Sequence, residues 1–315
     1  MNAAQSPIVS IDRVDGIAVV TVNNPPVNTI DAGVRAALSE AVAQLEGARD
    51  VRAVVLLCAG STFFSGADIG EFNGPPKEEE YRALFNRIEA LPVPVVVAMH
   101  GTVMGGGLEI ALAGHWRLAV PTARFGLPEV TLGIIPGAGG TQRMPRLIGV
   151  EKTLELVLSA RPVDARTGVE LGFLDAIVET GVERSPDLRS AALAWTREQL
   201  AKGAGPRRTG ERSVDPATAT PEILERAKAQ ARKQYPHRQA GLTAVEAIAA
   251  SARLPLAQGL ELETKLVNEA KATVESRAAV HVFFAERATR KVPGLPAGTE
   301  PRPVRKGGVI GAGTM

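Results

Sequence analysis

Several features that identify whole classes of protein are scarce or missing in this sequence. It has one cysteine, Cys58, which excludes an intrachain disulfide and a cysteine-based zinc site. No apolar run approaches the ~18 residues of a membrane-spanning helix, and the N-terminus has neither a basic nor an apolar leader segment. Its 36 basic and 34 acidic residues nearly cancel, so no broad positive field attracts nucleic acid. We therefore expect a soluble cytoplasmic protein with no metal ion, membrane span or nucleic-acid partner.

The residues that are present predict a globular α/β protein. Apolar residues make up 45% of the 315 residues, enough for a large buried core and a smaller second part. Two β-rich runs meet at Asp15-Gly16, a dipeptide typical of a tight hairpin turn. Strand and helix patterns then alternate as in a mostly parallel sheet. We expect strands over 8–14, 17–22, 53–58, 93–99, 116–120 and 176–178, and helices from about Asp31, Lys77 and Leu108.

Beyond about residue 187 the strand patterns stop. Residues 187–202, 221–234 and 241–290 have helical patterns, and a basic stretch rich in Pro, Gly and Thr separates the first two. Residues 291–306 contain four prolines and two glycines, which is typical of a linker. Residues 307–315 resemble the first strand and turn of a dinucleotide-binding domain, with two of the three glycines of its phosphate-binding turn.

Two glycine-rich loops lead into predicted helices. Gly66 lets the chain turn so that the Ala67 N–H points outward, and the run Gly105–Gly107 leaves backbone amides uncovered by side chains. Two such N–H groups aimed at one carbonyl oxygen would form an oxyanion hole, which stabilises the charge of an enolate-like thioester. A turn or a close packing contact is the simpler explanation for either loop alone.

Two glutamates lie in apolar surroundings near such loops. Glu109 comes directly after the glycine run, and Glu129 lies in the apolar segment 125–130. Burial disfavours an ionised carboxylate, so both could exchange protons near neutral pH. A structural role is open for each of them, namely capping a helix or pairing with an arginine such as Arg143. Spacing alone does not show that the two side chains meet.

Three segments together resemble one known family. They are Phe64–Ile69, Gly105–Glu109 and Pro128–Arg143, the last of which contains Pro136-Gly137-Ala138-Gly139-Gly140-Thr141-Gln142-Arg143. On these motifs the chain resembles the crotonase, or enoyl-CoA hydratase/isomerase, family over about residues 8–200. The resemblance implies an α/β fold, a crotonase-like spiral of ββα units, followed by a helical C-terminal region.

The resemblance also implies roles for individual residues. The N–H groups of Ala67 and Gly106 would hold the thioester oxygen. Glu109 and Glu129 would be the acid/base residues, and the Gly137 N–H would contact the reacting water. The implied substrate-binding residues are Ser65, Ala67, Asp68, Ile69, Gly70 and Gly106. The implied reaction is hydration of trans-2-enoyl-CoA to 3-hydroxyacyl-CoA, with isomerisation of 3-enoyl-CoA to 2-enoyl-CoA in the same site.

Segments nearer the C-terminus resemble the junction of multifunctional β-oxidation enzymes, in which a hydratase/isomerase part precedes a 3-hydroxyacyl-CoA dehydrogenase. They include Thr243–Ala247, Leu260–Glu263 and Phe283–Arg287. The resemblance implies that a dehydrogenase domain is missing from this chain, that NAD belongs to that domain, and that a thiolase is a further partner. In a eukaryote it makes the peroxisome the alternative to the cytoplasm. The expected organisation is a catalytic core over 1–200, a helical linking region over 201–290, a linker over 291–306 and a truncated first strand over 307–315.

Three other functions are open. Crotonase relatives also hydrolyse or decarboxylate acyl-CoA, although the presence of both glutamates favours hydration. The C-terminal glycines suggest a non-catalytic nucleotide-binding module, and the basic helical segments suggest a nucleic-acid binder. The incomplete glycine turn weighs against the nucleotide-binding module, and the near-zero net charge weighs against the nucleic-acid binder.

Overall fold

Two β-sheets form the first part of the molecule. The computed structural model describes residues 7–179, 185–289, 294–296, 298–300, 302–311 and 313. A six-stranded sheet has the order β1-β2-β3-β4-β6-β9, and a three-stranded sheet has the order β5-β7-β8. The strands are β1 Val9–Val14, β2 Ile17–Val22, β3 Ala53–Cys58, β4 Val95–Met99, β5 Thr102–Met104, β6 Trp116–Ala119, β7 Arg124–Gly126, β8 Val163–Asp164 and β9 Ala176–Ile177.

The sheet topology follows from the hairpin and the crossovers. β1 and β2 are antiparallel, and both turn residues, Asp15 and Gly16, have positive φ as a tight hairpin requires. The other pairs of the large sheet are parallel, so each needs a crossover connection. After β4 and after β6 the chain adds one strand to the small sheet and then enters a helix. These repeats are the predicted ββα units, which confirms the fold class.

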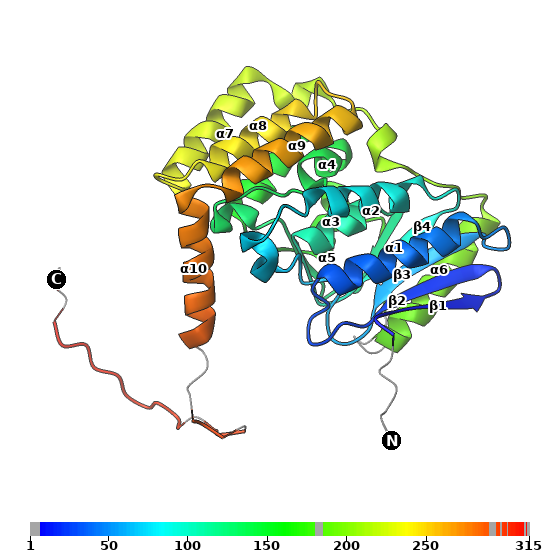
Figure 1. The fold of residues 1–315 in the computed structure, drawn as a ribbon, viewed down its shortest axis with the longest axis horizontal. Helices are drawn as coiled ribbons and strands as arrows, with labels where there is room; N and C mark the ends of the chain where they lie inside the picture. The colour runs from blue at the N-terminus through cyan, green and yellow to red at the C-terminus, as the bar shows by residue number, and fades with distance from the viewer. Residues whose placement is uncertain are drawn as a thin grey trace.

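The helices cover the large sheet and then form a layer of their own. Helix α1 packs against β1 and β2, α6 packs against β3 and β4, and α4 contacts α7, α8 and α9 (Figure 1). Helix α10 stands apart and contacts η2 and α9 (Figure 1). The helices are α1 Ala32–Glu46, η1 Ile69–Asn73, α2 Glu78–Ala90, α3 Gly106–Ala113, η2 Glu129–Leu132, α4 Gly140–Ser159, α5 Ala165–Leu171, α6 Ser185–Ala201, η3 Thr209–Glu211, η4 Pro216–Ala219, α7 Pro221–Gln234, α8 Ala240–Ala250, α9 Leu256–Lys271 and α10 Val274–Thr289.

Three expectations about single elements were wrong. The segment 100–107, expected as a loop, contains β5, and α3 begins at Gly106 instead of Leu108. Strands β7 and β8 were not predicted, because strands of two or three residues are too short to show an alternating pattern. The expected helical stretch 241–290 is three helices, and Pro255 stands at the first break, where it begins α9 as its N-cap.

The C-terminal segment extends away from the rest of the molecule in Figure 1. Its described residues, from Gly294 onward, form no helix or strand, and the side chains of Val309 and Ile310 are exposed. Ala312, Thr314 and Met315 of the predicted glycine turn lie outside the described residues. The four-part domain organisation therefore stays a prediction. None of the described helices is long and apolar enough to cross a membrane.

Candidate active site

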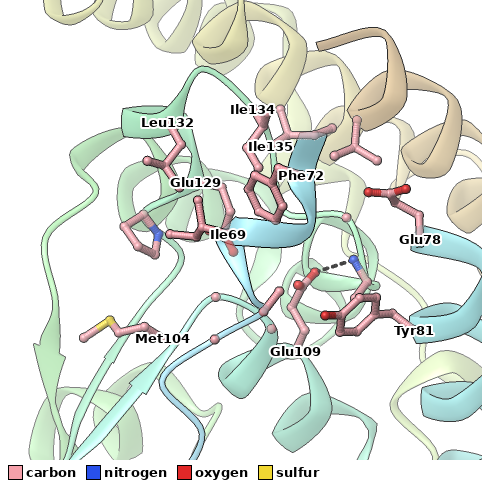
Figure 2. A pocket seen from close by; sticks show the side chains of 18 of the residues that line it. Ile69, Phe72, Glu78, Tyr81, Met104, Glu109, Glu129, Leu132, Ile134 and Ile135 are labelled. Atoms are coloured by element: carbon pink, nitrogen blue, oxygen red, sulfur yellow. Dashed lines mark hydrogen bonds between the residues drawn. The ribbon is translucent and has the colours of Figure 1, made fainter. Parts of the chain in front are cut away.

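One cavity brings most of the predicted site residues together (Figure 2). It lies where the loop before η1, the N-terminus of α3, the η2 segment and the turn before α4 meet α9. The predicted residues that line it are Ser65, Ala67, Ile69, Gly106, Glu109, Glu129 and Gly137. Asp68 lines an adjoining cavity instead, and its Oδ1 caps η1 by accepting the Gly70 N–H at 2.8 Å. Gly70 lines neither cavity.

The backbone amides of Ala67 and Gly106 lie close together in the lining of this cavity. A methyl group placed on Gly106 would lie 3.3 Å from the Ala67 nitrogen, so the two amides are neighbours. Within the described part of the chain, neither of these N–H groups donates to a backbone acceptor. Gly107 permits the approach, because a side chain there would come within 2.1 Å of the Phe64 carbonyl oxygen. The arrangement fits an oxyanion hole for one carbonyl oxygen.

Glu109 is buried, and its charged form is supported by backbone donors. Its Oε1 accepts the N–H groups of Ala138 and Gly140, both at 2.8 Å, and Figure 2 shows the side chain facing the cavity. Burial raises the pKa of Glu109, and the two donors oppose that rise. Glu109 therefore also caps α4, one of the two structural roles left open. Among the described residues no arginine forms an ion pair with Glu109, and Arg143 binds Glu89 at 2.8 Å.

Glu129 is buried with weaker support for its charged form. It begins η2, and its Oε2 has no hydrogen-bond partner among the described residues. Gly105, with φ of 52°, leaves room for the carboxylate, since a side chain there would lie 2.7 Å from Oε1. Burial, together with the negative charge of Glu109, raises the pKa of Glu129 well above its usual range. These surroundings therefore favour the protonated form of Glu129.

The turn before α4 supplies a further donor. Gly137 lines the cavity, and its N–H donates to no backbone acceptor in the described ranges. A side chain on Gly137 would lie 3.0 Å from both methyl groups of Val267, so α9 packs directly on this turn. The position of Gly137 in the cavity lining is compatible with the predicted contact between its N–H and the reacting water.

Sequence analysis missed the site residues contributed by α2 and α9. Glu263 is buried and binds the turn before α4, and Lys271 pairs with Glu78 while its Nζ lies 4.3 Å from the Phe72 ring centroid. One signal for Glu263 was present, because it occupies the helical stripe of Leu260 and Val267, both buried. An acidic residue on an apolar helix face usually has a specific partner. No comparable signal marked Lys271.

No group of three or more His, Cys, Asp or Glu residues within the described ranges could hold a metal ion. The expectation of a metal-free site stays a prediction.

Comparisons with known proteins agree with the motifs. The family model described as Enoyl-CoA hydratase/isomerase matches residues 12–235. A glyoxysomal fatty acid beta-oxidation multifunctional protein MFP-a of Brassica napus is 37% identical over 314 residues, which is 96% of this chain and 42% of that protein. A peroxisomal bifunctional enzyme of Danio rerio is 37% identical over 304 residues, which is 95% of this chain and 41% of that protein. The chain thus spans less than half the length of these relatives.

Solved structures share the fold. An enoyl-CoA hydratase/isomerase from Pseudoalteromonas atlantica superposes with a TM-score of 0.64 and 21% identity, over 89% of this chain and 97% of its own. DspI from Pseudomonas aeruginosa gives a TM-score of 0.56 and 30% identity, over 72% of this chain and 97% of its own. The chain therefore belongs to the enoyl-CoA hydratase/isomerase family, as its three motifs predict.

Proposed function

We propose that this chain hydrates trans-2-enoyl-CoA to 3-hydroxyacyl-CoA and isomerises 3-enoyl-CoA to 2-enoyl-CoA in the same cavity. The observation that carries the proposal is the meeting of two free N–H groups, of Ala67 and Gly106, with two buried carboxylates in one mostly apolar cavity. The N–H pair would stabilise an enolate-like thioester, and the carboxylates would move the protons.

Hydration divides the work between the two glutamates. Glu109, whose charged form is supported by two N–H donors, would act as the base that activates water for attack at C3. The free Gly137 N–H would help to hold that water. Glu129, whose surroundings favour the protonated form, would deliver the proton to C2. Isomerisation needs no water, so Glu129 alone would carry the proton between C2 and C4.

The substrate would lie across two adjoining cavities. The catalytic cavity has an apolar wall that suits an acyl chain, formed by residues such as Met104, Leu132 and Ile134. Phe72, Tyr81 and Lys271 line both this cavity and the adjoining one, which offers the CoA part a continuous path. The thioester would then lie between the acyl wall and this path, at the N–H pair.

A spectroscopic assay tests the proposal. Hydration removes the conjugated double bond, so the enoyl-thioester absorbance of crotonyl-CoA should fall when the chain is added. A thiol reagent added in parallel detects free CoA, which a hydrolase of this fold would release. Unchanged absorbance with a folded chain would reject hydration, and release of CoA thiol would favour the hydrolase alternative.

We also infer that this chain uses no cofactor of its own. The proposed reactions transfer only protons and the elements of water, so neither of them needs NAD. Relatives named multifunctional or bifunctional are longer than this chain, which fits the further domain that the sequence resemblance implies. Since those relatives are named glyoxysomal or peroxisomal, the peroxisome is the proposed location for a eukaryotic source. A cytoplasmic location and a thiolase partner stay predictions.

A further inference from the structure

Glu263 is a buried carboxylate that the proposed mechanism does not use. It projects from α9 and accepts the N–H of Gly139 at 2.6 Å on Oε1 and the N–H of Thr141 at 3.0 Å on Oε2. The Thr141 hydroxyl also donates to Oε2. Its side chain is 1% exposed, so these contacts replace the water that a carboxylate would otherwise bind. Glu263 is therefore tied to the turn that begins α4.

The same turn holds the proposed base. The N–H groups at positions 138 and 140 donate to Glu109, and those at 139 and 141 donate to Glu263. Four consecutive amides thus alternate between two carboxylates, which reach the turn from α3 and from α9. If one carboxylate is lost, the turn can shift toward the other. The position of the turn relative to the cavity consequently depends on both.

We propose that Glu263 is a positioning residue for hydration. It fixes residues 138–141 so that both N–H donors stay on Glu109 Oε1 and the Gly137 N–H faces the reacting water. The inference rests on the proposed hydratase function. Glu263 reaches no reacting atom itself, since it does not line the catalytic cavity.

Packing alone does not account for a carboxylate at this position. Its neighbours on the α9 stripe are Leu260 and Val267, which are buried and apolar. Burial, and secondarily the charge of Glu109, raises the pKa of Glu263 to about 8, while its hydrogen bonds from Thr141 and Gly139 oppose that rise. Replacing a buried charged group by an apolar one is often neutral or stabilising. What the carboxylate supplies is two acceptor oxygens at the spacing of the Gly139 and Thr141 amides.

The first test is Glu263→Gln. Whichever way the new amide is turned, its nitrogen faces either the Gly139 or the Thr141 N–H and cannot accept from it. We expect kcat for hydration to fall by about 10²-fold through misplacement of the turn, with KM little changed. Isomerisation, which does not use Glu109, should keep its rate. The matched control is Glu261→Gln, which alters an exposed carboxylate on the same helix and should change neither reaction.

A double variant tests whether Glu263 acts through Glu109. If it does, Glu109→Gln combined with Glu263→Gln should hydrate no more slowly than Glu109→Gln alone. The inference would be overturned if the double variant hydrated more slowly than Glu109→Gln alone. It would also be overturned if Glu263→Gln lost hydration and isomerisation equally, or if its hydration rate were unchanged. Absence of hydration in the unmodified, folded chain would reject the proposed function instead.

A second pair of variants decides the matter if Glu263→Gln does not fold. Thr141→Val removes only the hydroxyl that donates to Glu263, whereas Thr141→Ser keeps it. We expect a lower hydration kcat in Thr141→Val, with isomerisation retained, and near-normal hydration in Thr141→Ser. Equal hydration rates in the two variants would overturn the inference.

Discussion

Glu109 and Glu129 face the same cavity, yet their carboxylates are held in opposite ways. Glu109 accepts two backbone N–H groups on one oxygen, while Glu129 has an oxygen with no hydrogen-bond partner among the described residues. The pKa of both is raised by burial, and that of Glu129 is raised further by the charge of Glu109. The difference fits the proposed division of work, in which Glu109 is the base and Glu129 is the acid.

The largest effect is expected for Glu129→Gln. Both reactions need this side chain to move a proton at C2, so both turnover rates should fall by up to about 10⁴-fold. Crotonyl-CoA absorbance measures hydration, and conversion of a 3-enoyl-CoA to the conjugated isomer measures isomerisation. Isomerisation at an undiminished rate would contradict the role given to Glu129.

Glu109→Gln should separate the two reactions. Its amide cannot activate water, so hydration should fall by about 10²- to 10³-fold, while isomerisation should keep most of its rate. The same two assays measure the ratio of the rates. Equal losses would show that the two carboxylates do not divide the work.

Gly106→Pro should act through the oxyanion hole, which both reactions share. Proline removes the N–H at the first position of α3, where a helix tolerates it, and the loss of one donor should cost about 10²-fold in each reaction. Near-normal turnover in a folded proline variant would place the donor elsewhere.

The smallest effect concerns stability and pH. Because the pKa of Glu263 is about 8 in the folded chain and 4.5 when unperturbed, the folded state keeps a proton that the unfolded chain has released. The free energy of unfolding therefore falls as pH rises between these values, and Tm should be lower at about pH 8.5 than at about pH 6.5. Calorimetry on Glu263→Gln should show a smaller decrease. An identical decrease in the variant would mean that Glu263 does not carry the effect.

Much of the large sheet could be predicted from the sequence. Strands such as β3 and β4 are buried on both faces, so they are continuous apolar runs that stand out between glycine-rich loops. The small sheet could not be predicted, because its strands have two or three residues and depend on neighbours that other segments supply.

The site was predictable only where a motif marked it. Glycines and glutamates near the turns pointed to the N–H pair and to both carboxylates. The apolar stripe of α9 marked Glu263 as unusual, but its partner was not predictable, since Glu263 meets Gly139 across 124 residues of sequence. Such a contact is set by the packing of helices and not by any local pattern.

That separation bears on when the site forms during synthesis. The N-terminal strands, α3 and the turn before α4 leave the ribosome well before α9, which supplies Glu263, Val267 and Lys271. Contacts between distant parts of a chain form late, because a long loop must first be closed. The ion pair between Lys271 and Glu78 spans 193 residues. A nascent chain that has folded its sheet should therefore stay inactive until α9 docks.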